Sequence, residues 1–163
     1  MLREPSPGEW LSPAQFQEVV CVTPLVAIDL VVRSPEGRVL VGQRKNEPAR
    51  GTYFVPGSRI TKNETLAGAF QRITREELGL ERQLGEARFL GVYEHFYGTN
   101  RFEVAGFGTH YIVLAHELTG VCADRALPED QHGDYRWLTV QELLDSPQVH
   151  ANTKAYFKSG AAA

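Results

Sequence analysis

Residues 54–80 read FVPGSRITKNETLAGAFQRITREELGL, and this stretch decides the fold. It begins with a Pro-Gly turn and continues, over residues 64–78, with the spacing of a helix. Leu66, Phe70 and Ile73 follow one another at intervals of four and three and form an apolar stripe. The next step of four lands on Glu77, so a carboxylate continues the stripe that the helix should bury.

A buried carboxylate at Glu77 costs free energy unless something compensates it, and a cation is the simplest partner. Gly57 permits close backbone approach before the helix, so its carbonyl could join Glu77 on a hard cation. Oxygen ligands favour Mg²⁺ or Mn²⁺. The alternative is that Glu77 lies at a frayed helix end and reaches water, and the spacing leaves both interpretations open.

Length and composition indicate one domain over residues 1–163, with 42% hydrophobic residues to form a core. A net charge of −3 gives no electrostatic reason to expect a nucleic-acid partner. Two cysteines are too few for a disulfide framework, and no 18 apolar residues run together. We therefore expect a cytoplasmic protein that does not span a membrane, with a disordered tail at 159–163.

The order of the predicted elements indicates a mixed sheet with helices packed against it, an α/β fold. Ser12 is a candidate N-cap for a short helix, and residues 18–22 lead into a buried strand at 24–32. After a turn at 34–37, residues 38–44 alternate like the hairpin partner of that strand. Further strands are expected at 88–97, 108–118 and 134–138. Thr139 caps a following helix, and residues 149–157 form a terminal one.

The central stretch resembles the Nudix box, G-x5-E-x7-R-E-U-x-E-E-x-G-U, where U is bulky and apolar. Its fixed positions are occupied here by Glu64, Arg72, Glu76, Glu77, Gly79 and Leu80. Ser58 replaces the box glycine, beside Gly57, and Thr74 replaces an apolar residue. Ile73 replaces the glutamate that, in many Nudix enzymes, contributes to metal binding or to activating water.

The GDP-mannose mannosyl hydrolase branch of the family also lacks that glutamate, and the chain is similar to this branch over most of residues 23–157. The matching stretches are TPLVAIDLVV, GQRKNEPARGTYFVPG, RITKNETL, GVYEHFY, THYIVL, PEDQHGDYRWLT and VHANTKAYF. The resemblance implies the Nudix α/β/α sandwich with a mixed β-sheet between helices, a nucleotide-sugar substrate and a homodimer.

The resemblance also implies a divalent ion, Mg²⁺ with Mn²⁺ as a substitute, that bridges the two phosphates. Its ligands would be the Gly57 carbonyl, Glu77 and Gln131, and Glu76 leaves room for a further contact. Without the resemblance, Gln131 is better explained as a polar loop residue. Arg72 would orient the carboxylates of the helix, although an ion pair with Glu76 on the surface is an alternative.

His132 would be the general base, because an imidazole can take a proton from water near neutral pH. It lies in LPEDQHGD, residues 127–134, which indicates a mobile loop that closes over the substrate. Glu129, Asp130 and Asp134 would raise the pKa of His132 if they lie close to it. A solvated loop histidine is the alternative.

The remaining site residues also come from the resemblance. Arg44 and Arg59 would contact the diphosphate, since an arginine fork binds two oxygens. Asp29 would lie near the sugar hydroxyls, and His95 and Tyr111 would flank the substrate. The residues alone leave other interpretations open: surface charges for the arginines, a core histidine for His95 and a packed aromatic for Tyr111.

These roles predict hydrolysis of GDP-mannose, or a related GDP-hexose, to GDP and free sugar. Water would attack the anomeric carbon with inversion, and the metal-bound diphosphate would leave without a general acid. One alternative is a Nudix pyrophosphohydrolase that cleaves the nucleoside diphosphate sugar at phosphorus. Another is an inactive module that senses a nucleotide sugar.

Overall fold

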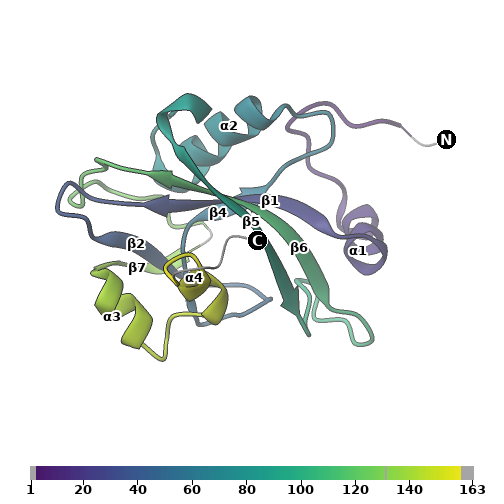
Figure 1. Cartoon of the computed structure of the whole chain (residues 1–163). Helices are drawn as coiled ribbons and strands as arrows, with labels where there is room; N and C mark the ends of the chain where they lie inside the picture. The colour runs from purple at the N-terminus through teal and green to yellow at the C-terminus, as the bar shows by residue number, and fades with distance from the viewer. Residues whose placement is uncertain (1–2, 131, 159–163) are drawn as a thin grey trace.

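The computed structural model describes residues 3–130 and 132–158, in which the strands form two sheets (Figure 1). The first sheet has the order β4-β1-β6-β5. Its strands are β1 (Leu25–Val32), β4 (Gly57–Arg59), β5 (Arg88–Tyr97) and β6 (Thr109–Leu118). β1 runs parallel to β6 and antiparallel to β4, so the sheet is mixed as predicted.

The second sheet is antiparallel and has the order β3-β2-β7. It consists of β2 (Val39–Arg44), β3 (Tyr53–Phe54) and β7 (His132–Leu138). The prediction that residues 38–44 form a hairpin with the first strand was therefore wrong. β4 and β6 pair with the two edges of β1, so no edge is left for β2. In the described part of the chain, an isolated bridge between Arg33 and Val39 connects β2 to the end of β1.

The central helix α2 (Leu66–Leu78) covers one face of the mixed sheet (Figure 1). Thr65 caps it by accepting a hydrogen bond from the Gly68 N–H at 3.0 Å, so it begins two residues later than predicted. Phe70 and Ile73 are fully buried against Ile28 and its neighbours in the core, which confirms the apolar stripe. Leu66, at the exposed first turn, is 39% exposed and does not belong to the core.

Shorter helices complete the layers. α1 (Pro13–Val22) has the predicted Ser12 cap, and α3 (Val140–Asp145) has the predicted Thr139 cap. The terminal helix α4 (Ala151–Ala155) is shorter than expected, and η1 (Leu84–Glu86) is a single 3₁₀ turn before β5. α3 and α4 lie with the second sheet on the side of the molecule away from α2 (Figure 1). The predicted α/β architecture is confirmed.

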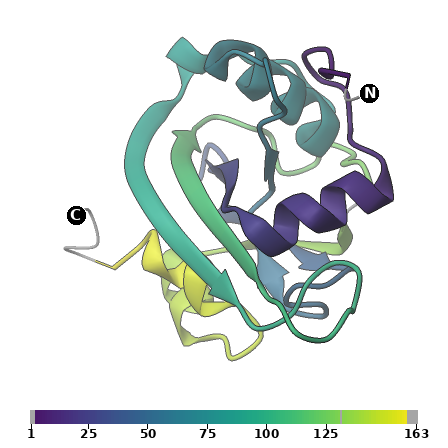
Figure 2. The same cartoon turned by 90° about the vertical axis from the view of Figure 1, so that its right-hand side faces the viewer.

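α1 packs beside the loop that joins β5 to β6 (Figure 2). Its buried residues Phe16 and Val20 form a small separate core with Leu25, against which Phe102 and Tyr111 pack. The N-terminal helix therefore closes one end of the space between the sheets. Within the described residues, no helix has the length and apolarity that a bilayer crossing requires.

Candidate active site

A cavity of about 570 Å³ opens between the two sheets, α1 and the C-terminal end of α2. The predicted site residues that line it are Asp29, Arg44, Gly57, Arg59, Glu76, Glu77, His95, Tyr111 and His132. Arg72 lies behind the wall of the cavity, and Gln131 falls outside the described residues. The fold thus brings nearly all of the predicted residues to one place.

Gly57 and Asp29 are antiparallel partners on β4 and β1. A Cβ atom on Gly57 would overlap Oδ1 of Asp29 and would lie 2.6 Å from the carbonyl oxygen of Ile28. Only glycine allows this close approach. The prediction that Gly57 permits close approach is confirmed, although Gly57 begins a strand instead of forming a turn.

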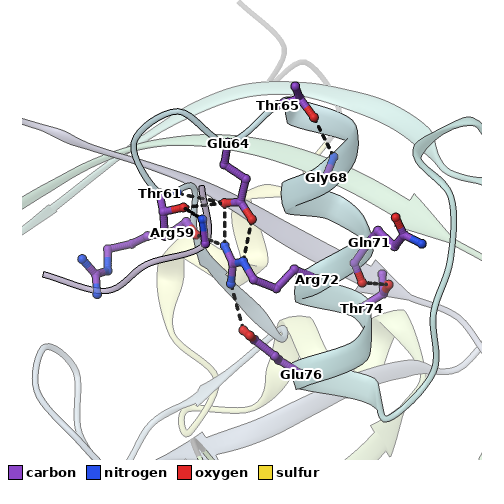
Figure 3. Close-up of polar contacts among 10 residues, drawn as sticks. Arg59, Thr61, Glu64, Thr65, Gly68, Gln71, Arg72, Thr74 and Glu76 are labelled. Atoms are coloured by element: carbon purple, nitrogen blue, oxygen red, sulfur yellow. Dashed lines mark hydrogen bonds and ion pairs between the residues drawn. The ribbon is translucent and has the colours of Figure 1, made fainter. Parts of the chain in front are cut away.

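Arg72 is the centre of a buried ion-pair network beside the cavity (Figure 3). Its Nε and Nη2 donate to the two carboxylate oxygens of Glu64 at 2.7 and 2.9 Å, and Nη1 donates to Glu76 at 2.8 Å. A fourth hydrogen bond reaches the carbonyl oxygen of Arg59 at 2.8 Å. The side chains of Arg72 and Glu64 are 9% and 7% exposed, so this pair is buried. The predicted alternative, an ion pair with Glu76, is also present, and the Glu76 side chain is 40% exposed. The guanidinium joins the helix to the strand that carries Arg59.

Glu77 is buried, with 5% of its surface exposed, so the frayed-end interpretation was wrong. Burial, followed by the charges of Glu76 and Asp29, raises the pKa of Glu77 to about 8. The negative charges of Glu76 and Asp29 thus disfavour ionisation of Glu77, and a cation bound beside Glu77 would favour it. The apolar stripe of α2 therefore continues into a buried carboxylate, Glu77, at the point where the helix meets the cavity.

His132 departs from prediction in two respects. It is the first residue of β7, pairs with Arg44 on β2 and is 5% exposed, so it does not belong to a mobile loop. Burial, followed by the charges of Arg44 and Lys45, lowers its pKa to about 4, whereas acids were expected to raise it. Asp134 has no such effect because it is exposed and engages Tyr53 and Arg136.

The His132 ring is nevertheless well placed to act on a bound ligand. It is neutral at pH 7, the form that can accept a proton. Its Nδ1 atom is buried, has no hydrogen-bond partner among the described residues and lies 3.8 Å from Oε2 of Glu77. A buried unpartnered nitrogen beside a buried carboxylate, both on a cavity wall, indicates a functional site.

Two arginines line the cavity from opposite sheets. Cζ of Arg44 lies 5.3 Å from the centre of the Phe54 ring, and Cζ of Arg59 lies 3.5 Å from the Phe16 ring. Burial, with the charges of Arg101 and Arg72, lowers the pKa of Arg59 to about 10, so it stays charged at neutral pH. Both cations are positioned to meet an anionic ligand.

Asp29 and His95 form a polar corner with Tyr156, which follows α4. The Tyr156 hydroxyl donates to Oδ2 of Asp29 at 2.5 Å and lies 3.4 Å from Nε2 of His95. Burial raises the pKa of Asp29 to about 6, although the Tyr156 hydrogen bond acts in the opposite direction. His95 is 4% exposed and also lines the cavity, which confirms the alternative of a buried histidine, whereas its place beside a substrate stays a prediction.

Sequence reasoning missed several cavity residues, namely Trp10, Phe16, Tyr97, Arg101 and Phe102. The Trp10 ring lies 4.8 Å from Cζ of Arg59 and 5.1 Å from Cζ of Arg72. These aromatic and basic residues come from α1, the segment before it, the end of β5 and the β5–β6 loop. No local pattern marks them, because their proximity depends on how α1 folds back over the sheet.

The donor set suits a hard divalent cation in part. Glu77, Glu76 and the Gly57 carbonyl supply oxygen only, which Mg²⁺ prefers. Among residues 3–130 and 132–158, no group of three or more His, Cys, Asp or Glu side chains could hold a metal by itself. Substrate oxygens and water would therefore complete the coordination, as is usual for Mg²⁺ bound with phosphates.

Comparison with known proteins gives a match to the family described as NUDIX domain over residues 23–158. The low-salt glycan biosynthesis protein Agl8 of Haloferax volcanii is 48% identical over 106 residues, which are 64% of this chain and 65% of that protein. An ADP-ribose pyrophosphatase of Methanocaldococcus jannaschii is 34% identical over 43% of this chain and 40% of its own length. The chain thus spans less than two thirds of each of these relatives.

Solved structures share the fold. A MutT NUDIX hydrolase from Burkholderia pseudomallei aligns with a TM-score of 0.63 and 26% identity, over 84% of this chain and 98% of that one. A MutT protein from Methanosarcina mazei aligns with a TM-score of 0.65 and 20% identity, over 82% and 91% of the two chains.

Proposed function

The chain belongs to the NUDIX family, and from this premise we propose that it is a hydrolase that cleaves GDP-mannose, or a related GDP-hexose, to GDP and free sugar. One observation carries the proposal. Ile73 occupies the position of the missing box glutamate and is fully buried in the core. His132, in contrast, lines the cavity from β7 of the second sheet. A base for water is therefore available on β7 and absent at that position of the helix.

The proposed roles follow the walls of the cavity. Glu77, Glu76, the Gly57 carbonyl and Gln131 would hold Mg²⁺ or Mn²⁺, which supplies charge stabilisation to the diphosphate. Arg44 and Arg59 would bind the diphosphate oxygens, and Arg72 orients the helix carboxylates. Asp29 would lie near the sugar hydroxyls, and His95 and Tyr111 would flank the substrate.

In the proposed reaction, His132 accepts a proton from a water molecule. The water oxygen bonds to the anomeric carbon, and the bond between that carbon and the diphosphate oxygen breaks with its electron pair on GDP. The configuration at the carbon inverts, because attack comes from the side opposite to the leaving group. The arginines stabilise the charge that GDP gains.

A second candidate is a pyrophosphohydrolase that cleaves a nucleoside diphosphate sugar at phosphorus. The similarity to an ADP-ribose pyrophosphatase supports it, and so do Glu76 and Glu77, which both line the cavity. Similarity to a protein of glycan biosynthesis supports a sugar-containing substrate for either reaction. The two reactions differ in the atom that water attacks.

Hydrolysis of GDP-mannose in ¹⁸O-labelled water distinguishes them. The proposal expects GDP and mannose, with the label in the sugar. Attack at phosphorus gives GMP and mannose phosphate, with the label in phosphate, and would replace the first proposal by the second. Binding without turnover in the presence of Mg²⁺ would instead indicate a nucleotide-sugar sensor.

We also propose that the chain acts as a single-domain homodimer in the cytoplasm. The homodimer rests on the resemblance to the GDP-mannose branch. Sedimentation equilibrium measures it directly, and a mass of one chain over the working concentration range would contradict it.

A further inference from the structure

Tyr156 lies behind two cavity residues without lining the cavity itself. Its hydroxyl touches Asp29 on β1 and His95 on β5, so three separate elements meet at one oxygen. Burial, together with the charge of Asp29, raises the pKa of Tyr156 well above 10, and the hydroxyl keeps its proton. The aromatic ring is fixed by an edge contact with Tyr93, whose centroid is 4.7 Å away.

A tyrosine hydroxyl has one proton, and here it has two neighbours that could receive it. The 2.5 Å contact to Asp29 is short and leads to a carboxylate, so the proton is donated there. The Tyr156 oxygen can then only accept from His95, 3.4 Å away. Nε2 of His95 must carry a hydrogen for that contact, which leaves Nδ1 as the acceptor nitrogen of the neutral ring.

From this chain of hydrogen bonds we infer that Tyr156 is a positioning residue, which orients the Asp29 carboxylate and selects the Nε2–H tautomer of His95. Asp29 and His95 both line the cavity, and each keeps an acceptor that Tyr156 does not contact: Oδ1 of Asp29 and Nδ1 of His95. Two adjacent acceptors suit a ligand that offers neighbouring hydroxyl groups. The inference thus rests on the proposed function for its substrate, a hexose, and makes that corner the sugar end of the cavity.

The experiment compares the tautomer of His95 in the wild type, Tyr156→Phe and Tyr93→Phe, by ¹⁵N chemical shifts of the imidazole in the ligand-free protein. A His95→Gln spectrum assigns the signals. Wild type and Tyr93→Phe should show a protonated Nε2 and a bare Nδ1. Tyr156→Phe removes one oxygen and keeps the ring, so the fold should persist while both tautomers become populated. Unchanged ¹⁵N shifts in Tyr156→Phe would overturn the inference.

Kinetics with GDP-mannose provide the second measurement. Loss of a hydrogen bond to a charged group should lower kcat/KM of Tyr156→Phe by about 10- to 100-fold, chiefly through KM, because the sugar contacts exist in ground and transition states alike. Tyr93→Phe should stay within about twofold of wild type. An equal loss in both variants would reduce Tyr156 to a packing residue. Should the wild type fail to hydrolyse GDP-mannose, the proposed function fails, and the ¹⁵N shifts still decide the tautomer.

Discussion

Gly42 on β2 lies directly against the ring of His132: a Cβ atom on Gly42 would come within 2.7 Å of Cγ and 2.8 Å of Cδ2 of that histidine. Gly42 and Tyr135 are strand partners, so the backbone beneath the ring is held by the second sheet. The histidine is therefore positioned by the absence of a side chain on the neighbouring strand.

Gly42→Ala should displace the imidazole and lower the turnover of GDP-mannose by about 10²-fold, since small displacements of a catalytic group cost about that much. Gly85→Ala is the matched control, because a Cβ atom there meets no atom within 4 Å. Thermal unfolding of both variants separates displacement from loss of fold. A fully active Gly42→Ala enzyme would show that His132 tolerates a shift and is not the base.

Glu77→Gln should weaken metal binding while the fold persists, since the amide keeps the shape and removes the charge. We expect the Mg²⁺ concentration for half-maximal activity to rise, and EDTA to abolish the activity of the wild type. Glu81→Gln is the control, because the Glu81 side chain is 46% exposed and does not line the cavity. An unchanged Mg²⁺ dependence in Glu77→Gln would contradict its assignment as a ligand.

Arg72→Ala should lower the free energy of unfolding by about 3–5 kcal/mol, because it leaves the buried carboxylate of Glu64 unpaired. Arg75→Ala, three residues along α2, removes an arginine that is 59% exposed and should change stability by about 0.5 kcal/mol or less. Urea unfolding measures both. Equal effects of the two substitutions would mean that the buried network contributes no more than a surface pair.

Glu117 links the stability of the mixed sheet to pH. Burial raises its pKa, but N–H donors of Arg33 at 2.7 Å and Arg88 at 2.9 Å outweigh burial and hold the pKa below its ordinary value of 4.5. A lowered folded-state pKa gives stability that is present above pH 4.5 and is lost as the pH falls through the folded-state value. Glu117→Gln should therefore be less stable than wild type by about 1 kcal/mol at pH 7.

That difference between wild type and Glu117→Gln should be smaller at pH 3 than at pH 7, because the wild-type carboxyl takes up its proton as the pH falls below 4.5 through the folded-state pKa. Urea unfolding of the two proteins at both pH values measures it. A difference that stays constant between pH 7 and pH 3 would mean that the lost charge is not its cause.

Local signals predicted the elements well, because each depends on neighbours in the sequence. The caps Ser12 and Thr139, the apolar run of β1 and the stripe through Phe70 all act over a few residues. The spacing gave burial of Glu77 as one of two open interpretations, and the structure decides in its favour. Most of the predicted residues that line the cavity came from the resemblance, which carries over positions that chemistry alone would leave as surface charges or core residues.

The missed features depend on contacts between distant parts of the chain. The pairing of β2 with β7 joins residues near 40 to residues near 136, and that pairing makes His132 a buried strand residue. Tyr156 reaches Asp29 across 127 positions. No periodicity in these segments indicates such long-range contacts. The direction of the His132 pKa shift therefore could not be predicted from the acidic residues next to it in the sequence.

Because Asp29 and Gly57 belong to one sheet while Arg44 and His132 belong to the other, the proposed chemistry depends on how the two sheets pack together. Within the described residues, the bridge between Arg33 and Val39 is the β-bridge that joins them. Side-chain packing, rather than a continuous ladder, sets the spacing of the two halves. We therefore expect heating to disturb the packing between the sheets before either sheet unfolds. Hydrolysis should then be lost at a lower temperature than the circular dichroism signal of the sheets.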